Sequence, residues 1–303
     1  MSARREVTVV VPATSANLGP GFDSLAVALG LYDEVTARVI DGGASTVDVH
    51  VEGEGADELP RDGTHLVVRA MHETYAAMSM KPPGLALRCV NSIPHGRGLG
   101  SSAAAIVAGV VAARALVGDG EQLDDQAALA LAARIEGHPD NVAACLLGGL
   151  TVAWRDSVGA HAARLDPAPS VDALVFVPTG RLDTETARGM LPAVVPHEDA
   201  AHAAGRAALL VEALTRRPEL LLAATEDRLH QRYRASAMPG TADLVDRLRS
   251  AGVPAVVSGA GPSVLALVIS GERPPLASDP GPGWSVVRLP LDAGGARLTS
   301  SEG

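Results

Sequence analysis

Apolar and polar positions alternate through much of the first half of the chain, and this alternation predicts strands. Longer apolar blocks between the alternating runs have the spacing of helices. The strands predicted in this half cover residues 7–12, 32–40, 46–52, 85–90 and 150–155, and the helices cover residues 65–80, 100–117 and 124–136.

The second half contains several helical blocks followed by apolar strands. Helices are predicted at 184–191, 198–215, 219–231 and 241–251, and strands at 173–178, 254–258, 264–270 and 284–289. Prolines and glycines between the last two strands predict an irregular surface loop. The mixture predicts an α+β protein with two domains, residues 1–160 and 161–303.

Composition narrows the range of partners. The 303 residues are 47% hydrophobic, which suffices for real cores, and carry a net charge of −10. This acidic balance disfavours nucleic acid or an anionic membrane as the main ligand. Cys89 and Cys145 lie inside apolar runs, which indicates buried thiols in a reducing compartment. We find no signal peptide and no transmembrane run, so we expect a cytoplasmic protein.

Lys81 is the only lysine in the chain, between Met80 and Pro82. A Walker A loop needs lysine before Ser or Thr, and a protein kinase needs a strand lysine in a signature that is absent here. Any ATP chemistry must therefore hold the phosphates in another way.

The first polar segment, residues 12–24, reads PATSANLGPGFDS and follows a strand. The glycines and proline alone predict a turn. Asn17 and Asp23 flank this turn, and their amide and carboxylate offer an alternative role as ligands for a polar molecule.

The second segment, IPHGRGLGSSAAA at 93–105, connects a strand to a helix through alternating glycines. Free backbone N–H groups at such a helix start favour a phosphate. Ser101 and Ser102 can cap the helix or ligate Mg²⁺. Position 101 is Ser where a Rossmann fingerprint needs Gly, so we favour a phosphate loop of another kind.

The third segment, VVSGAGPSVLALV at 256–268, is either a hairpin turn between buried strands or part of a site. A fourth cluster follows the helix that ends at Glu136, where His138, Asp140 and Asn141 surround Pro139 in a predicted turn. Its apolar flanks favour a site over a solvated loop.

PATSANLGPGFDSLAVAL, IPHGRGLGSSAAA and SGAGPSVLAL, in this order, resemble the GHMP family of small-molecule kinases, from Val7 to about Leu289. ANLGPGFD (16–23), EGHPDNVA (136–143), TETARGMLP (184–192) and LHQRYR (229–234) are similar to the members that phosphorylate the side-chain hydroxyl of L-homoserine. The resemblance implies an S5-like N-terminal domain and a ferredoxin-like C-terminal domain, with ATP and substrate between them.

The resemblance also implies site residues. The ATP phosphates would be wrapped by Pro94, His95, Gly96, Arg97, Gly98, Leu99, Gly100, Ser101, Ser102, Ala103 and Ala104. Ser102 and Glu136 would hold Mg²⁺. In the substrate site, Asp23 and Asn17 would bind the amino group, Arg188 and Arg234 the carboxylate, and His138, Asn141 and Thr184 would line the acceptor hydroxyl. Arg188, Asp140 and Asn141 are the expected catalytic residues.

Two positions depart from the family pattern. His65 stands where similar proteins usually have an Asn associated with the adenine contact, and Ser263 replaces a more typical Thr. Asp140 is either a general base or a structural hydrogen-bond acceptor. The rival hypotheses are a GHMP kinase of the mevalonate or phosphomevalonate type, and a catalytically inactive family member that binds a nucleotide or metabolite as a sensor. Asp23 beside Asn17 disfavours the first, and the presence of Ser102 and Glu136 disfavours the second. The likeness also implies a possible homodimer.

Overall fold

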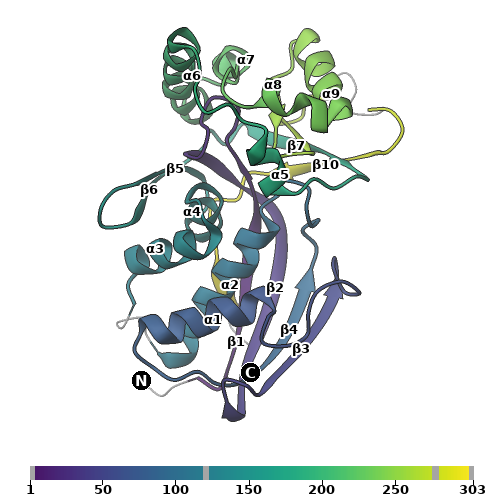
Figure 1. Ribbon diagram of the computed structural model, residues 1–303. Helices are drawn as coiled ribbons and strands as arrows, with labels where there is room; N and C mark the ends of the chain where they lie inside the picture. Colours follow the sequence, from purple (N-terminus) through teal and green to yellow (C-terminus); the bar gives the residue numbers. More distant parts are fainter. Residues whose placement is uncertain (1–3, 119–122, 275–279, 300–303) are drawn as a thin grey trace.

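The computed structural model describes residues 4–118, 123–274 and 280–299, which form two sheets covered by helices (Figure 1). The strands of the first sheet are β1 (Glu6–Ala16), β2 (Leu25–Gly43), β3 (Val47–Gly53), β4 (Pro83–Asn91), β5 (Leu150–Arg155), β6 (Ala160–Leu165) and β11 (Arg297–Thr299). Their order is β11-β1-β2-β4-β3, and β5 pairs with both β2 and β6. Only β3 and β4 run parallel among the described pairs of this sheet.

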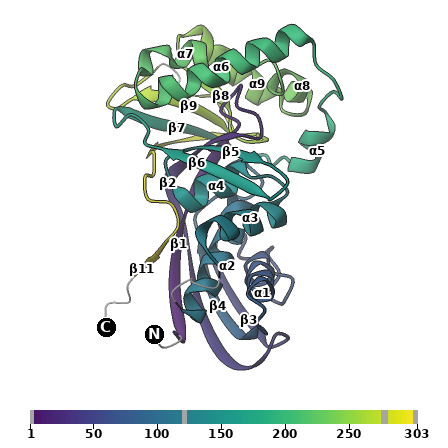
Figure 2. The same cartoon turned by 90° about the vertical axis from the view of Figure 1, so that its left-hand side faces the viewer.

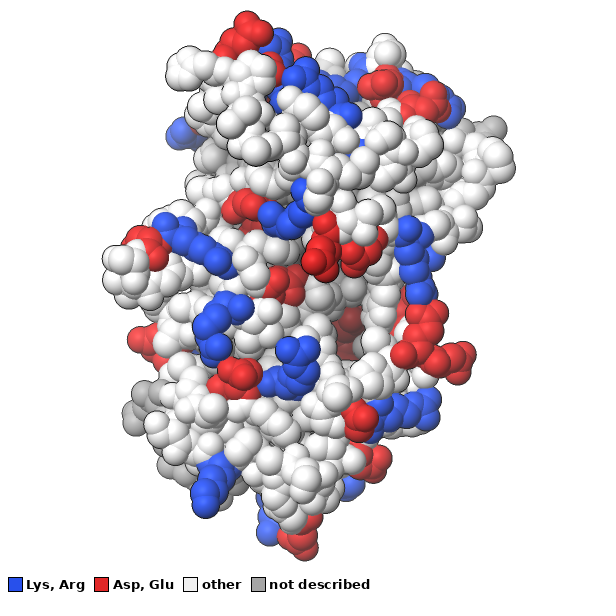
Figure 3. Space-filling model, viewed as in Figure 1, with Lys and Arg blue, Asp and Glu red and all other residues white. Residues whose placement is uncertain are grey.

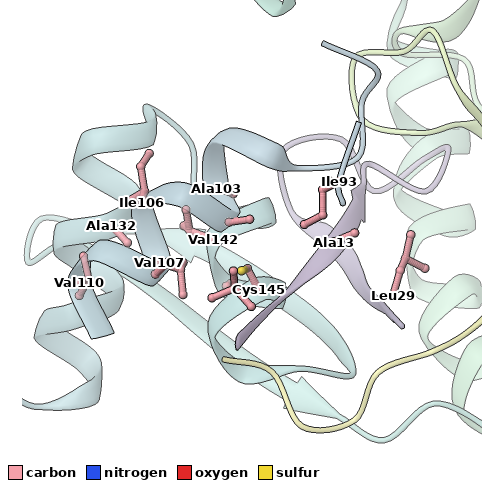
Figure 4. Close-up of a cluster of buried hydrophobic side chains, with 14 of the residues drawn as sticks. Ala13, Leu29, Ile93, Ala103, Ile106, Val107, Val110, Ala132, Val142 and Cys145 are labelled. Atoms are coloured by element: carbon pink, nitrogen blue, oxygen red, sulfur yellow. The ribbon is translucent and has the colours of Figure 1, made fainter. Parts of the chain in front are cut away.

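Four helices cover one face of the first sheet, as Figures 1 and 2 show. They are α1 (Leu66–Ala77), α2 (Ser101–Val117), α3 (Asp125–Glu136) and α4 (Asp140–Leu147). Helix α2 is apolar on nearly every side because the other three helices and the sheet surround it. Figure 4 shows its side chains, including Ile106 and Val107, in one cluster with residues of α3, α4, β1 and β2.

The second sheet consists of β7 (Val171–Pro178), β8 (Ala255–Val257), β9 (Val264–Ile269) and β10 (Trp284–Pro290). Its order, β10-β7-β9-β8, is entirely antiparallel and corresponds to the 4-1-3-2 arrangement of a ferredoxin-like sheet. The helical segments above it are α5 (Thr184–Gly189), α6 (His197–Thr215), α7 (Leu221–Ala224), α8 (Gln231–Arg234), α9 (Pro239–Ser250) and two 3₁₀ turns, Pro218–Leu220 and Ala235–Ala237. Figure 2 shows α6, α7 and α9 on the outer face of this sheet.

The α+β prediction is confirmed, as are most of the predicted elements. The strand of residues 32–40 is longer than predicted, because β2 begins at Leu25. The continuous helix at 219–231 is wrong. The Asp227 carboxylate accepts hydrogen bonds from the backbone N–H groups of Leu229, His230 and Gln231, which replaces helical bonding there.

Helix α4 and the strands β6 and β11 are among the elements that were not predicted. The turn expected at 138–141 is the beginning of helix α4, because Pro139 directly precedes its first residue, Asp140. The edge strands β6 and β11 carry too little apolar alternation to be recognised. The two-domain division at residue 160 stays a prediction. In the structure β6 and β11 both belong to the first sheet, so the chain returns to that sheet at its end.

Both cysteines are free and buried, as predicted. Burial raises the pKa of Cys89 to about 12 and that of Cys145 well above its usual value. None of the helices in the described ranges is long and apolar enough to cross a membrane.

Candidate active site

A cavity of about 220 Å³ lies between the two sheets and collects the polar segments singled out in the sequence. Figure 3 shows acidic and basic side chains together around a hollow in the middle of this face. The predicted residues that line the cavity are Asn17, Asp23, Gly96, Gly98, Leu99, Gly100, Ser101, Ser102, Glu136, His138, Asp140, Asn141, Thr184, Arg188 and Arg234.

The glycine loop before α2 is shaped by its neighbours. Gly96, Gly98 and Gly100 all have left-handed backbones, with φ of 64°, 71° and 72°. A Cβ at Gly98 would lie 2.2 Å from the carbonyl oxygen of Ser258, and one at Gly100 would lie 1.9 Å from Thr14 Oγ1. The loop therefore packs against both other segments so closely that only glycine fits at these two positions.

Helix α2 begins with Gly100 at its N-cap, and no side chain caps it. Its first backbone N–H groups and the positive end of its dipole therefore remain available to an anion. Ser102, which the sequence offers as a helix cap or a metal ligand, does not cap the helix and donates from Oγ to Glu136 Oε1 at 2.6 Å.

Hydrogen bonds join the three segments into one unit. Ser258 Oγ donates to Gly98 O at 2.6 Å and lies 2.8 Å from Ser15 Oγ. Thr14 N donates to Leu99 O, and Gly259 N donates to Ala16 O. The sequence left open whether the third segment is a hairpin turn or part of a site, and the structure shows a hairpin that also borders the cavity. Strands β8 and β9 pair in antiparallel fashion, and Gly259 and Ala260, between them, line the cavity.

The pair predicted to hold Mg²⁺, Ser102 and Glu136, lies where the first turn of α2 meets the last residue of α3. Glu136 is the last residue of α3, and burial raises its pKa although the Ser102 hydrogen bond opposes this shift. A carboxylate and a hydroxyl supply oxygen ligands, which are the ligands that Mg²⁺ prefers. The described residues hold no cluster of three or more His, Cys, Asp or Glu suited to a metal. Mg²⁺ here would therefore need phosphate and water oxygens as its remaining ligands, as is usual in kinases.

Asp23 and Arg188 pair with each other across the cavity. Arg188 Nη1 lies 3.0 Å from Asp23 Oδ2, and Nη2 lies 2.5 Å from Oδ1. The Asp23 hydrogen bond raises the pKa of the Arg188 guanidinium. Asn17 supports this arrangement, because its Oδ1 accepts from Asp23 N and its Nδ2 donates to Gly259 O. Asn17 and Asp23 both have left-handed backbones, with φ of 69° and 54°.

A second guanidinium faces the same cavity without an acid partner. Arg234 is 1% exposed, donates from Nε to Ala187 O, and has no carboxylate within ion-pair distance among the residues described. Its side chain and that of Arg188 both lie over the ring of Phe22, at 5.4 and 5.7 Å. Burial and the nearby Arg188 charge lower the Arg234 pKa. The guanidinium still stays cationic, because arginine titrates far above neutral pH.

The fourth cluster is a connected hydrogen-bond chain. His138 Nδ1 lies 2.7 Å from Asp140 Oδ1, which also accepts from the Asn141 N–H at 2.8 Å. Burial alone would lower the His138 pKa, but the hydrogen bond and charge of Asp140 and the charge of Glu136 outweigh burial and raise it. Asn141 Oδ1 accepts from Thr14 Oγ1, so its amide nitrogen is left for the cavity.

Several predicted residues lie outside this cavity. Arg97 donates to the carbonyls of His95, Pro178 and Thr179, which joins the loop to the end of β7. Pro94 and Ala103 are absent from the lining, and His95 and Ala104 line a neighbouring cavity instead. Sequence reasoning missed the lining residues Leu182 and Asp183. No motif marked them, although they directly precede Thr184.

The neighbouring cavity, of about 190 Å³, shares Ser101 and Ser102 with the first. Its walls are mainly apolar and come from β1, β2, α1 and α2. Its polar side chains outside the glycine loop are Asp33, His65 and Asn91. An apolar chamber beside a phosphate-type loop has the form of a pocket for a flat, partly polar ring.

Comparisons with known proteins agree with this geometry. Residues 65–149 match the family model "GHMP kinases N terminal domain", and residues 199–279 match "GHMP kinases C terminal". The chain is 60% identical to the homoserine kinase of Streptomyces avermitilis, over 96% of this chain and 95% of that one. It is 58% identical to the homoserine kinase of Streptomyces coelicolor, over 96% and 94%.

Solved structures show the same likeness. The crystal structure of homoserine kinase from Cytophaga hutchinsonii superposes with a TM-score of 0.86 at 27% identity, covering 99% of both chains. A putative homoserine kinase from Listeria monocytogenes gives 0.75 at 29% identity, covering 97% of this chain and 99% of that one.

Proposed function

This chain belongs to the GHMP kinase family, and from that premise we propose that it transfers the γ-phosphoryl group of ATP to the side-chain hydroxyl of L-homoserine. The product of this reaction is O-phospho-L-homoserine. Relatives that carry the name homoserine kinase match nearly the whole chain, which supports the assignment within the family.

The observation that carries the proposal is the charge arrangement in the cavity. Asp23 provides an acceptor for an ammonium group, and Arg188 and Arg234 provide donors for a carboxylate. A free amino acid is the small molecule that carries both groups on one carbon. A mevalonate-type substrate has the carboxylate but no ammonium, so binding its carboxylate to Arg188 would leave Asp23 without a cationic partner.

The phosphates of ATP would lie at the start of α2, where the uncapped N–H groups donate to them. The base would enter the apolar cavity that shares Ser101 and Ser102 with the substrate cavity. Ser102 and Glu136 would hold Mg²⁺, which neutralises phosphate charge when it is bound. No lysine is needed to bind the phosphates here, because backbone N–H groups and arginines would supply the positive potential.

The acceptor hydroxyl would meet the His138–Asp140–Asn141 chain and Thr184. We assign Asp140 a positioning role. Its Oδ1 already accepts from His138 and from the Asn141 N–H, and only 1% of the residue is exposed. Phosphoryl transfer depends mainly on orientation and charge stabilisation, so a general base is not required. Asn17 would act by holding Asp23, while its direct contact with the amino group stays a prediction.

A coupled assay of ATP consumption with L-homoserine, L-serine, L-threonine and mevalonate tests the proposal. We expect turnover with L-homoserine far above the others, and phosphorus NMR should identify a phosphate monoester of its hydroxyl. Preference for mevalonate would support the first rival. ATP binding without turnover of any alcohol would support the sensor. Cytoplasmic location and a homodimer remain predictions.

A further inference from the structure

His230 is a fully buried histidine that directly precedes helix α8, and it has no part in the substrate contacts described above. Its Nε2 lies 2.9 Å from the carbonyl oxygen of Gly19, and its Nδ1 lies 3.2 Å from Nη1 of Arg234. The ring also packs on Phe22, with 5.3 Å between the ring centroids. One imidazole therefore contacts both the turn that carries Asp23 and an arginine expected to bind the substrate carboxylate.

The two hydrogen-bond partners of His230 define its protonation state. A carbonyl oxygen can only accept, so Nε2 carries the proton that is donated to Gly19. A guanidinium can only donate, so Nδ1 carries the lone pair that accepts from Arg234. Both bonds can exist only while the imidazole is neutral. A second proton, on Nδ1, would remove the acceptor and place a cation against the Arg234 guanidinium.

The surroundings of His230 keep the ring neutral near pH 7. Burial lowers the pKa of His230 most, and the positive charge of Arg234 lowers it further. The negative charges of Asp227, whose Oδ2 lies 3.8 Å from Nε2, and of Asp23 oppose this shift, as does the hydrogen bond to Gly19, but they do not outweigh it. The pKa therefore lies below the usual value of about 6.5.

The bond to His230 is one of two that hold the Arg234 guanidinium. The other runs from Nε to the carbonyl oxygen of Ala187, which directly precedes Arg188 on α5. Because the guanidinium is planar, two bonds in its plane fix its orientation. Arg234 makes no further side-chain hydrogen bond to a described residue, and it lines the cavity. Its other N–H groups are therefore available to a carboxylate.

We infer that His230 is a positioning residue, which holds Arg234 in register with the Asp23 turn so that one amino acid can reach both, and which weakens substrate binding when it is protonated. This inference rests on the proposed function, because that function places the homoserine carboxylate at Arg234. Protonation breaks the bond at Nδ1 and repels the guanidinium. Affinity for homoserine is therefore full near neutral pH and declines as the pH falls through the lowered pKa of His230.

The test uses two variants that each keep one half of the imidazole. In His230→Asn, the amide oxygen takes about the place of Nδ1, so Arg234 keeps an acceptor while the bond to Gly19 is lost. In His230→Gln, the longer amide reaches Gly19 but leaves Arg234 without an acceptor at the Nδ1 position. At about pH 7.5, His230→Gln should raise the KM for homoserine by about 2- to 12-fold and leave the KM for ATP unchanged. His230→Asn should stay near the wild type in both constants.

The pH profile separates positioning from a merely structural role. At saturating ATP, the KM for homoserine should rise between about pH 7.5 and pH 5 more steeply in the wild type than in His230→Asn, which cannot be protonated at this position. His138 also titrates in the cavity, but it is present in both proteins, so the difference between their profiles isolates His230. His202→Asn is the matched control. His202 lies on α6 and does not line the cavity, so its loss should leave the KM and its pH profile unchanged.

The inference is overturned if the wild-type KM for homoserine does not rise in acid, or if the profiles of the wild type and His230→Asn are parallel. Equal effects of the two variants on this KM, or a KM for ATP that moves with it, would also overturn it. Should His230→Gln fail to fold, the comparison of pH profiles decides alone. Each of these results leaves the proposed function standing as long as the wild type phosphorylates homoserine. A wild type that does not phosphorylate homoserine refutes the proposed function and this inference with it.

Discussion

Asp23 and Arg188 neutralise each other through two parallel hydrogen bonds, although 165 residues separate them in the chain. The family resemblance assigns Asp23 to the ammonium group and Arg188 to the carboxylate of one substrate. More than a third of each side chain is exposed, so solvent screens the pair and it adds little to stability. A zwitterion can replace this one ion pair by two, because its ammonium binds Asp23 while its carboxylate binds Arg188.

Arg188→Lys should raise the KM for homoserine by roughly 10-fold or more and leave the KM for ATP near its wild-type value. Lysine keeps the charge but cannot make the two-pronged contact that the planar guanidinium makes. Steady-state kinetics with each substrate varied in turn will measure both constants. Parallel increases in the two constants would show that Arg188 acts on the fold or on the transferring phosphate.

Arg181→Lys provides the control for this change. Arg181 pairs with Glu58 near the glycine loop but does not line the substrate cavity. Both kinetic constants should stay close to wild type in this variant.

Local patterns predicted the elements that position the site, because those elements have strong apolar periodicity. Helix α2 was recognisable from its Ala and Val content, and the glycine loop from its alternating glycines. The break in the helix after α7 was not recognisable from the sequence. It depends on one carboxylate, that of Asp227, which accepts hydrogen bonds from three backbone N–H groups. Such a competition between helix and side-chain bonding leaves no periodic signature.

The sequence also indicated which residues meet in the site, but not how they bind one another. Asn17 lines the cavity as predicted, but the sequence did not show that its amide also joins Asp23 to Gly259, 242 residues away from Asn17. Arg97 was expected at the phosphates, whereas it donates to three carbonyls around the end of β7. These partners come from distant segments, and only the three-dimensional fold specifies them.

Glu136→Gln should lower kcat by about two orders of magnitude or more while the fold is retained. The amide oxygen can still accept the Ser102 hydrogen bond, but the charge that would hold Mg²⁺ is lost. Turnover measured over a range of Mg²⁺ concentrations is the test. Near-normal turnover at low Mg²⁺ would contradict the assignment. Glu73→Gln, which removes a surface charge paired with Arg134, should have no such effect.

Gly98→Ala should abolish ATP binding and destabilise the protein strongly, because the added Cβ would lie 2.2 Å from Ser258 O. Gly96→Ala is the matched comparison. Its backbone is also left-handed, with φ of 64°, but its Cβ would meet the Arg181 side chain at ordinary distances of 3.5 Å or more. It should cost about 1–2 kcal/mol from backbone strain alone. Urea unfolding and ATP calorimetry separate these outcomes, and equal losses would mean that close packing at Gly98 is unimportant.

Asp33→Asn should stabilise the protein at alkaline pH and have little effect near pH 4. Burial raises the Asp33 pKa to about 6, so the folded state binds this proton more tightly than the unfolded state. The contribution of Asp33 to stability is therefore fully present below about pH 4 and is lost as the pH rises through about 6. Asparagine stays neutral and can still accept from Ser92 and Ile93. The gain at pH 8 should approach about 3 kcal/mol.

Asp62→Asn should show the opposite trend. Asp62 is exposed, and hydrogen bonds from Thr64 lower its pKa, so its contribution to stability is present at neutral pH and lost in acid. Unfolding free energies of both variants between about pH 2 and 8 provide the measurement, because the Asp62 contribution is lost only below about pH 4. If the difference in unfolding free energy between the wild type and Asp33→Asn does not change with pH, the raised pKa assigned to Asp33 is contradicted.

Asp23 should make the enzyme specific for an amino acid rather than for a plain hydroxy acid. A charged hydrogen bond to ammonium contributes about 1.5–3 kcal/mol, or roughly 10- to 150-fold in kcat/KM. The compound 4-hydroxybutyrate, which is homoserine without its amine, cannot exchange with the Asp23–Arg188 pair. Its carboxylate can bind Arg234, which has no acid partner among the described residues, but it gains no contact with Asp23. Binding Arg188 as well would leave the Asp23 carboxylate without a cationic partner, which enlarges the penalty.

Asp23→Asn should therefore reduce kcat/KM for homoserine far more than for 4-hydroxybutyrate, and so narrow the difference between the two compounds. The substitution also releases Arg188 from its ion pair, which favours any carboxylate and can even improve the analogue. The backbone hydrogen bond from Asp23 N to Asn17 does not involve the altered side chain, so the loop should keep its shape. The decisive data are kcat/KM values for both compounds on both proteins. Equal use of the two compounds by the wild type, or equal harm to both from the substitution, would show that the ammonium binds elsewhere.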